Sequence, residues 1–597
     1  MDIENLSVII NRNNKNVLGD DFLYYLKEIA QISKKTFVIL KNSVKEEITN
    51  SLRDLNIDFL FFDKDCSQYE FYKYAINKIG FEEIQKYDNL ILSNDSFYGP
   101  IYSFEDMFEQ MQNETCDYWG FLEKNITKFK FSFFKNKSED ISVTNSDFLV
   151  FKKNLLSSKE FKKWWNNSYN FKTQEDYEIK QEFYFKKQNF KVSAFMKFDN
   201  YKSVARNFNY SVSKLLENNQ LPIIPKASLF SPYSVTVENC LTHQTNDIVD
   251  FIKNKTNYDF ELIYKDIIKN NKMSELKENL HLNFVLPTDV VKQQFNQDKK
   301  VALIVYIYYA DLVDYCFKYI QSMPDNSDIY IVSSKDETLN SCREKAASID
   351  NYNFEFRLKE NKGRDVSAYL VSCADVFQKY DYICCVHDKK SPYFDSLIAE
   401  DFAYQCFECN LSTKNYVANV INTFESNPKI GLLTSPNMYF YHYLEGYSMF
   451  GNRTNLHNLY NKLNLTVPFD ETPIAPYGSM FWIRGDAIKP LFRHKWEYED
   501  FPTEPLPTDG TVSHAIERIY PFVAQEAGYL SGWIMPDSFC SIYLENLKYA
   551  QTKDLSEKQT SLFKNIFSIK NVYIENKKFK RITLFYNHFY NGRILNR

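Results

Sequence analysis

Two stretches of the chain, far apart in sequence, each end an apolar run in a polar turn that contains an aspartate. They are "KYDNLILSNDS", residues 86–96, and "KYDYICCVHDKKS", residues 379–391. Asp95 and Asp388 occupy the same place in the two stretches, and Asn94 aligns with His387. Ligands of open parallel sheets bind beyond the carboxyl ends of the strands. Either aspartate could therefore coordinate a divalent cation on a diphosphate, hydrogen-bond a sugar, or only cap a helix.

A second candidate is the Gly-Arg-Asp turn in "ENKGRDVSAYLVSCADVF", residues 360–377. Gly363 permits close backbone approach, Arg364 offers a planar bidentate donor suited to phosphate, and Asp365 can accept hydrogen bonds from a ribose or a base. A helix is expected to follow, with its apolar residues on one face. This arrangement predicts a nucleotide site, although an Arg-Asp ion pair in an ordinary turn would give the same sequence. The segment that stands at the corresponding distance before the first stretch, residues 86–96, has no Gly-Arg-Asp.

The third candidate is a late glutamate that also occurs twice. Glu178 stands twelve residues before Phe190, and Glu517 stands twelve residues before Tyr529. Glu517 lies near the start of the helix-like stretch "HAIERIYPFVAQEAGY" and off its apolar face. A carboxylate there could act as a general base, or it could be a surface acid favoured by the helix dipole.

Alternating strands and helices should position these residues. In the first hundred residues we expect strands at 8–10, 36–40, 59–62 and 90–92 and helices at 22–29 and 69–84, which favours an α/β layer with a largely parallel sheet. The second half repeats this order without a gap when each position is shifted by 293, so that Val8 falls on Val301 and Val38 on Ile331. We interpret this as an internal duplication.

Beyond the polar turns the two copies differ in length. The late glutamates are 339 positions apart, so the second copy has 46 more residues, the difference between 339 and 293. The excess includes "FYHYLEGYSMFGNRTNLHNLY", residues 440–460. Long loops in compact domains are often functional, so this segment could face an acceptor, or it could be an ordinary surface excursion.

Taken together, "NDSFYGPI", "CDYWGF", "NKGRDVSAYL", "HDKKS" and "AIERIYPFVAQEAGY" resemble the rhamnan synthesis F family, glycosyltransferases that build rhamnose-containing bacterial cell-surface polysaccharides. The resemblance spans roughly residues 8–537. It implies a GT-A-like, Rossmann-like α/β fold that binds a nucleotide sugar and that here would occur twice. The Gly-Arg-Asp turn and the Gly-Tyr that follows Glu517 favour the second copy as the better preserved site.

The resemblance also implies roles for the candidates. Asp388 and Asp95 match only the second acid of the Asp-x-Asp motif of GT-A enzymes, and Glu517 and Glu178 fit the position of the base. Asp388, and Asp95 in the first copy, would hold Mg²⁺ or Mn²⁺ on the diphosphate. The alternative to a metal is stabilisation of the departing diphosphate by positive side chains. The residues expected to contact the donor are Gly363, Arg364, Asp365, His387, Lys389, Lys390 and Asn94.

Composition sets limits on the remaining classes. The chain has 597 residues and a net charge of -5, which gives no argument for nucleic acid binding. Its start does not resemble a signal peptide and no run is long enough for a membrane span, so we expect a cytoplasmic protein. The last residues, 561–597, mix basic and aromatic side chains, which suits either peripheral association with the inner face of the membrane or packing against the body.

The sequence therefore predicts four parts: a GT-A-like domain at 1–221, a mainly helical connector at 222–295, a second GT-A-like domain at 296–548, and a basic aromatic tail at 549–597. The expected function is inverting transfer of a deoxyhexose, L-rhamnose from dTDP-L-rhamnose, to a lipid-linked glycan. The first copy would be either a second active site or a degraded copy kept for acceptor binding or scaffolding. The alternative from another class is a non-catalytic glycan-binding or assembly component.

Overall fold

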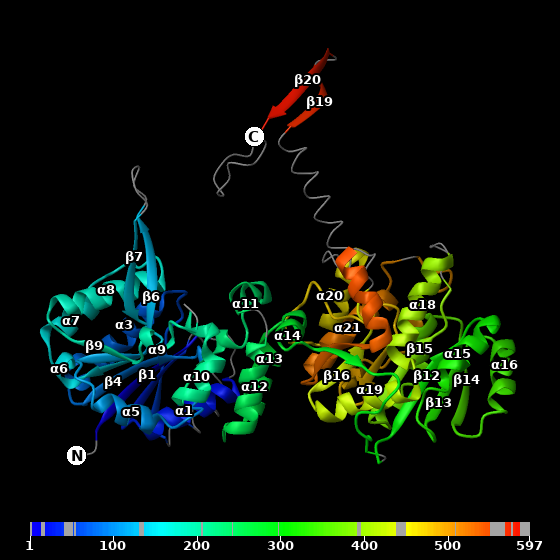
Figure 1. The fold of residues 1–597 in the computed structure, drawn as a ribbon, viewed down its shortest axis with the longest axis horizontal. Helices are drawn as coiled ribbons and strands as arrows, with labels where there is room; N and C mark the ends of the chain where they lie inside the picture. Colours follow the sequence, from blue (N-terminus) through cyan, green and yellow to red (C-terminus); the bar gives the residue numbers. More distant parts are fainter. Residues whose placement is uncertain are drawn as a thin grey trace. The chain divides into compact units, whose positions relative to one another are not determined.

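The fold is described from a computed structural model of the chain (Figure 1). The structure describes residues 3–12, 18–40, 52, 55–130, 137–204, 207–240, 243–296, 298–390, 396–437, 449–507, 509–549, 567–574 and 577–584. Contacts divide the chain into two compact units, Met1–His281 and Leu282–Arg597. Each unit is described by itself below. The boundaries expected at residues 221 and 295 stay predictions.

The first unit is built on a mixed sheet in the order β3-β2-β1-β4-β8-β6-β7, with β9 also paired to β6. The first four strands of this order run parallel, β8 is antiparallel to both neighbours, and β9 is parallel to β6. The strands are β1 (Asn5–Asn11), β2 (Lys35–Leu40), β3 (Ile57–Phe61), β4 (Asn89–Asn94), β6 (Tyr118–Lys130), β7 (Lys137–Thr144), β8 (Phe148–Lys152) and β9 (Val192–Met196).

Helices connect these strands and continue into the connector. The helix expected at 69–84 is broken at Gly80, whose φ of 90° ends α3 before α4 begins. The helices are α1 (Asp20–Gln31), α3 (Gln68–Ile79), α4 (Phe81–Ile84), α5 (Phe104–Gln112), α6 (Lys153–Leu156), α7 (Lys159–Asn166), α8 (Gln174–Lys187), α9 (Phe198–Tyr201), α10 (Val212–Asn219), α11 (Tyr233–Cys240), α12 (Gln244–Lys255), α13 (Phe260–Asn270) and α14 (Met273–Asn279). A separate two-stranded ladder joins β5 (Phe97–Tyr98) to β10 (Ile224–Pro225).

The second unit repeats the same plan. Its sheet has the order β11-β18-β16-β17-β15-β12-β13-β14, again with one antiparallel strand, β17, beside the central parallel set. The strands are β11 (Asn283–Leu286), β12 (Val301–Tyr306), β13 (Asp328–Ser333), β14 (Asn353–Leu358), β15 (Tyr382–His387), β16 (Ile430–Thr434), β17 (Phe481–Arg484) and β18 (Leu530–Pro536). Two tandem Rossmann-like α/β domains with equivalent strand orders confirm the predicted fold class.

Helices of the second unit include one irregular segment after the Gly-Arg-Asp turn. The sequence predicted a single helix there. The structure instead has a short α17, then a π-helical turn, η4 (Ala368–Ser372), and a 3₁₀ turn, η5 (Val376–Gln378). The α-helices are α15 (Val313–Ile320), α16 (Asp336–Ala346), α17 (Arg364–Ser367), α18 (Ser396–Leu411), α19 (Lys414–Ser426), α20 (Arg453–Lys462) and α21 (Val512–Glu526).

The strand registers correct the gapless offset of 293. Leu92 pairs with Val8, whereas Cys385, 293 positions later, pairs with Ile304 and not with Val301. The first strands therefore match with an offset of 296, while β2 and β13 keep the offset of 293. Loops of different length before and after each strand compensate one another, because loops absorb insertions that the sheet cannot. The long excess at 440–460 is described only in part, since residues 438–448 lie outside the described residues.

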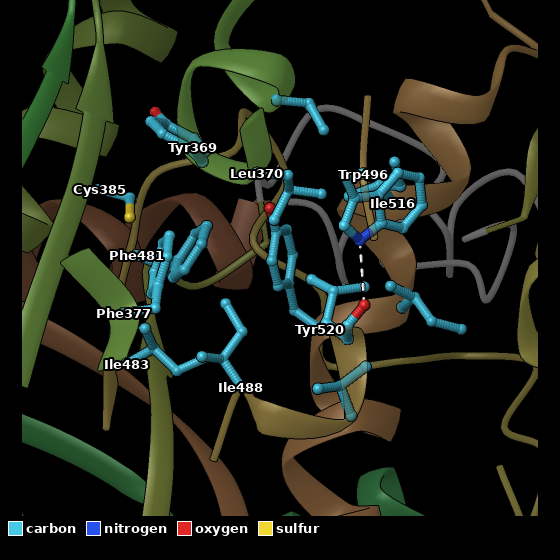
Figure 2. Close-up of a cluster of buried hydrophobic side chains, with 14 of the residues drawn as sticks. Tyr369, Leu370, Phe377, Cys385, Phe481, Ile483, Ile488, Trp496, Ile516 and Tyr520 are labelled. Atoms are coloured by element: carbon cyan, nitrogen blue, oxygen red, sulfur yellow. Dashed lines mark hydrogen bonds between the residues drawn. The ribbon is translucent and has the colours of Figure 1, made fainter. Parts of the chain in front are cut away.

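A continuous apolar core supports the end of the sheet where the candidate residues lie. Figure 2 shows Tyr369 and Leu370 of η4 with Phe481 and Ile483 of β17 and, from α21, Ile516 and Tyr520. Most of these side chains are fully buried. A close-packed core of this kind fixes the positions of the elements that carry functional groups.

Near the C-terminus, β19 (Phe567–Ile574) and β20 (Lys577–Leu584) form a two-stranded antiparallel ladder. Of residues 561–597 the structure describes only the backbone of these two strands, so the expected membrane contact of the basic and aromatic side chains stays a prediction. Among the helices that the structure describes, none combines the length and the apolar character needed to cross a membrane.

Candidate active site

Asp388 lies directly after β15 and ties that strand to the loop after β12. Its Oδ2 accepts hydrogen bonds from the backbone N–H groups of Tyr308 at 2.9 Å and Tyr309 at 2.7 Å. The residue is only 4% exposed. Burial raises the pKa of Asp388 to about 6, the two N–H groups work against this rise, and the nearby charge of Asp365 adds to it. A buried carboxylate with a pKa raised in this way is a candidate for binding a cation.

His387 and Glu517 meet at one residue, Gly478, in the turn before β17. The His387 Nε2 lies 2.7 Å from the Gly478 carbonyl oxygen, while the Gly478 N–H donates to the Glu517 Oε2 at 3.0 Å. Glu517 also lies 3.2 Å from the Arg518 guanidinium, and its side chain is 16% exposed. The structure thus brings the end of β15 and the first turns of α21 together around one turn.

Gly478 is a residue that the sequence reasoning missed. Its φ is 92°, and a Cβ there would lie 3.0 Å from the Phe402 ring and 3.2 Å from the Cys406 sulfur. Only the pattern of a glycine and a serine before the apolar strand β17 could have suggested it.

We expect Gly478→Ala to shift the turn that holds His387 and Glu517. A left-handed backbone costs a non-glycine residue about 1–2 kcal/mol, so thermal unfolding should occur a few degrees lower. The rate of any reaction that uses Glu517 should fall further than this modest loss of stability explains. Thermal melting and turnover measured on the same preparation test this, and an unchanged turnover would contradict the assigned role of the turn.

The Gly-Arg-Asp turn begins α17. Gly363 has a φ of 69°, and a Cβ there would lie 2.6 Å from the Phe501 ring. The Arg364 guanidinium forms a bidentate pair with Glu504, at 2.9 and 3.2 Å. Burial alone would raise the pKa of Glu504, but the hydrogen bonds from Arg364 hold that pKa below its usual value. Asp365 is half-buried and close enough to Asp388 for its charge to act there.

The two lysines after Asp388 are both held by aromatic rings. Lys389 lies over Phe402, with its Nζ 4.3 Å from the ring centre, and Lys390 lies 4.9 Å from the ring of Tyr309. Lys390 also forms an ion pair with Asp311. The turn that follows Asp388 therefore carries two positive side chains, and positive charge suits a diphosphate.

Of the corresponding residues of the first unit, Asn94 and Glu178 are buried, whereas the side chain of Asp95 is 17% exposed. The Asn94 side chain donates to Asp147 at 2.8 Å, and Asp95 accepts from the Arg12 N–H at 3.0 Å. The Glu178 side chain has no exposed surface and forms an ion pair with Lys124 at 2.6 Å. Burial raises the pKa of Glu178 although Lys124 lowers it.

The same backbone contact nevertheless recurs in both units. The Ser146 N–H donates to the Glu178 Oε1 at 2.9 Å, as the Gly478 N–H does to Glu517. The late glutamate therefore has an equivalent place in both copies, and the difference lies in its exposure.

A metal site can be judged from the donors present. Within the described ranges, no three His, Cys, Asp or Glu side chains gather as a full protein cage would require. Mg²⁺ bound through substrate phosphates takes only one or two carboxylates, and Asp388 fits that sparse arrangement, since both described hydrogen bonds to its carboxylate fall on Oδ2. Asp95 fits less well, because the Arg12 guanidinium lies 3.7 Å away.

The two units are tandem Rossmann-like α/β domains of the GT-A-like class, with acidic and basic groups at the strand ends of the second. The chain belongs to the family described as rhamnan synthesis protein F, whose model matches residues 36–529.

Individual relatives and solved structures are more distant. The uncharacterized protein WxcX of Xanthomonas campestris pv. campestris strain B100 is 27% identical over 172 residues, which cover 28% of this chain and 24% of WxcX. The chain thus spans about a quarter of the length of the curated relatives it matches.

Among solved structures, the glycosyltransferase GlyE of Streptococcus pneumoniae TIGR4 is similar over 65% of this chain and 87% of its own, with 8% identity and a TM-score of 0.22. The mannosyltransferase Ktr4p of S. cerevisiae in complex with GDP covers 30% of this chain and 62% of its own, with 9% identity and a TM-score of 0.18. TM-scores this low support neither a shared fold nor a shared function.

Proposed function

We propose that this protein is a glycosyltransferase whose second unit transfers a deoxyhexose, L-rhamnose from dTDP-L-rhamnose, with inversion to a lipid-linked glycan acceptor. The observation that supports this most is that His387 and Glu517 meet at Gly478, directly beside the buried carboxylate of Asp388 at the end of β15. A buried acid, a partly exposed carboxylate and flanking positive charge are the groups that such a transfer needs.

In this reaction Glu517 acts as the general base. Its carboxylate takes the proton from the acceptor hydroxyl as that oxygen attacks the anomeric carbon. The bond from the anomeric carbon to the diphosphate oxygen breaks on the opposite face, and its electron pair leaves with the nucleoside diphosphate. The exposed part of the side chain gives an acceptor access, while the Gly478 N–H fixes the carboxylate orientation.

The departing diphosphate gains negative charge that must be stabilised. Arg364, Lys389 and Lys390 supply positive charge from two loops, and Glu504 keeps the Arg364 guanidinium oriented. A divalent cation, held by Asp388, would supply Lewis acid stabilisation of the same oxygens. Transfer is then expected to stop on chelation and to return with Mg²⁺ or Mn²⁺.

We propose further that the first unit is not catalytic. The segment after its sheet folds back over the turn after β4, where β10 pairs with β5 and the Lys226 N–H donates to the Ser96 carbonyl oxygen at 2.8 Å. The Lys226 ammonium lies 2.6 Å from Asp21 and 3.2 Å from Asp266. Lys226 also interacts electrostatically with Asp95. These contacts of the chain with the turn after β4 support the proposal that the first unit does not bind a donor.

A donor screen tests the proposal most broadly. Purified full-length protein is incubated with dTDP-, UDP- and GDP-sugars and a lipid-linked acceptor, and the products are analysed by mass. We expect a deoxyhexose increment from the dTDP sugar and release of dTDP that depends on acceptor. Binding of glycan without any release of nucleotide would instead favour the non-catalytic assembly component.

A further inference from the structure

A buried lysine, Lys359, lies beneath the Gly-Arg-Asp turn. It follows β14 directly and is 5% exposed. Its Nζ donates to the carbonyl oxygens of Glu360 at 2.7 Å and Lys362 at 3.0 Å. Lysine is almost never buried to this degree without a specific set of partners. These two hydrogen bonds fix both ends of the segment that leads into Gly363.

Aromatic faces and acids compensate the charge of this lysine. Its Nζ lies 5.1 Å from the ring centre of Tyr306 on β12 and 5.9 Å from that of Tyr498. The carboxylates of Asp365 on α17, Glu504 in the loop before α21, and Glu360 act on it electrostatically. The lysine therefore joins the ends of β14 and β12 to the loop that holds Arg364.

The first unit provides an internal comparison. The Lys359 N–H donates to the Ser333 carbonyl oxygen at 2.9 Å, and the Phe62 N–H donates to that of Leu40 at 2.9 Å. Leu40 and Ser333 are equivalent residues of β2 and β13, so Phe62 stands where Lys359 stands.

Phe62 is engaged in an apolar contact, stacked on Tyr74 at 4.3 Å between ring centres. The first copy also has no Gly-Arg-Asp turn. The buried cation and the turn thus occur together in one unit and are both missing at the equivalent place in the other. This pairing indicates that the lysine serves the turn and not the α/β fold.

We propose that Lys359 is a positioning residue of the donor site, whose ammonium group holds the Gly-Arg-Asp turn in the shape that binds the nucleoside diphosphate. The inference rests on the proposed function. Lys359 acts through the carbonyl groups of Glu360 and Lys362, which place the Gly363 backbone and Arg364. Its charge also adds to the positive field at the site.

The protonation of Lys359 gives this role a distinct signature. Burial lowers the pKa of Lys359 to about 8, against the charges of Asp365, Glu504 and Glu360, which raise it. Its neighbours do not titrate in this range: burial raises the pKa values of Tyr306 and Tyr498 above the usual value, the pKa of Glu504 is lowered, and arginine stays charged. Donor affinity should therefore fall as the pH rises through about 8.

Calorimetric titration of the full-length protein with dTDP between pH 7 and pH 9 tests the inference. When only the charged form binds, one pH unit above the pKa leaves about a tenth of the protein competent, so the apparent Kd should rise about tenfold at pH 9. Lys359→Met should bind weakly at pH 7 and show no further loss, while Lys359→Arg should keep its affinity up to pH 9. Lys495→Met, at a side chain that is 89% exposed, should behave as wild type.

The outcomes separate this inference from the proposed function. Tight binding of dTDP that does not change between pH 7 and pH 9, or that survives Lys359→Met unaltered, overturns the role of Lys359 and leaves the transferase proposal standing. Absence of binding of dTDP, UDP and GDP by the wild type overturns the proposed function and this inference with it. If Lys359→Met does not fold by thermal melting, the wild-type pH profile and Lys359→Arg decide.

Discussion

Replacing Glu517 with glutamine is expected to reduce the rate of sugar transfer by about 10²–10⁴-fold, the contribution typical of a positioned general base. The glutamine oxygen can still accept the Gly478 N–H, so the turn before β17 should keep its shape. Donor affinity should therefore change little. Initial rates at saturating donor and acceptor, together with dTDP titration, measure the two effects separately.

Glu178→Gln is the matched control in the first unit. Glu178 makes the equivalent hydrogen bond to Ser146 but has no exposed surface and is paired with Lys124. Its replacement should lower stability by about 1–3 kcal/mol, because it leaves a charged partner unpaired, and should leave transfer at the wild-type rate. Loss of transfer in Glu178→Gln, or retention in Glu517→Gln, would show that the base has been assigned to the wrong copy.

Asp388→Asn is expected to make the protein more stable and less active. The asparagine oxygen can accept the N–H groups of Tyr308 and Tyr309, but no charge remains to be buried. Raising a pKa from 3.8 to about 6 corresponds to a penalty of up to about 3 kcal/mol for the ionised form. Transfer should fall by about 10²–10³-fold, since a charged group that organises the cation or the sugar is lost.

The pH dependence of this stability difference follows from the direction of the shift. The folded-state pKa of Asp388 is raised, so between about pH 4 and pH 6 the folded protein binds more protons than the unfolded chain, and stability falls as the pH rises. The advantage of Asp388→Asn should be largest above pH 6 and should disappear toward pH 4. Melting temperatures of both proteins across this range measure the difference. If Asp388→Asn were less stable than the wild type at pH 7, burial would not destabilise the ionised form of Asp388.

The sequence predicted the architecture because the apolar runs are long and recur in the same order. The strands after which Asp95 and Asp388 stand were placed correctly, with the offset of 293 between β4 and β15. The gapless alignment of β1 with β12 was wrong, since loops before β2 and β13 differ in length without changing the hydrophobic pattern. Register depends on pairing between distant strands, which a single sequence does not display.

The candidate site was predictable in its charged residues and not in the groups that hold them. Glu517 and Asp388 stood out by position, but the residue that joins Glu517 to His387 is Gly478, for which the sequence offers only a glycine and a serine before β17. Glu504, the partner of Arg364, and Lys359 lie in segments without a motif. Their roles arise from burial and from contacts between strand ends, which become visible only in three dimensions.

The contacts that surround Asp95 and Glu178 in the first unit could not be predicted either. Asp95 and Glu178 stand at the same positions as their counterparts, although the Gly-Arg-Asp turn and the Gly-Tyr already favoured the second copy. What distinguishes them is the segment that pairs with β5 and the ion pairs of Lys124 and Lys226, all made by residues far away in the chain. Equivalent position in a duplication therefore does not imply an equivalent site.

The number of nucleoside diphosphate molecules bound per chain tests the central claim most directly. Calorimetric titration of the full-length protein with dTDP, in the presence of Mg²⁺, should give one site. That site should persist in a variant with both Asp95→Ala and Glu178→Gln and be weakened at least about tenfold in Arg364→Ala, which removes a bidentate phosphate donor. Two sites per chain, or a single site that is lost with the first-unit substitutions and kept in Arg364→Ala, would contradict the assignment of donor binding to the second unit.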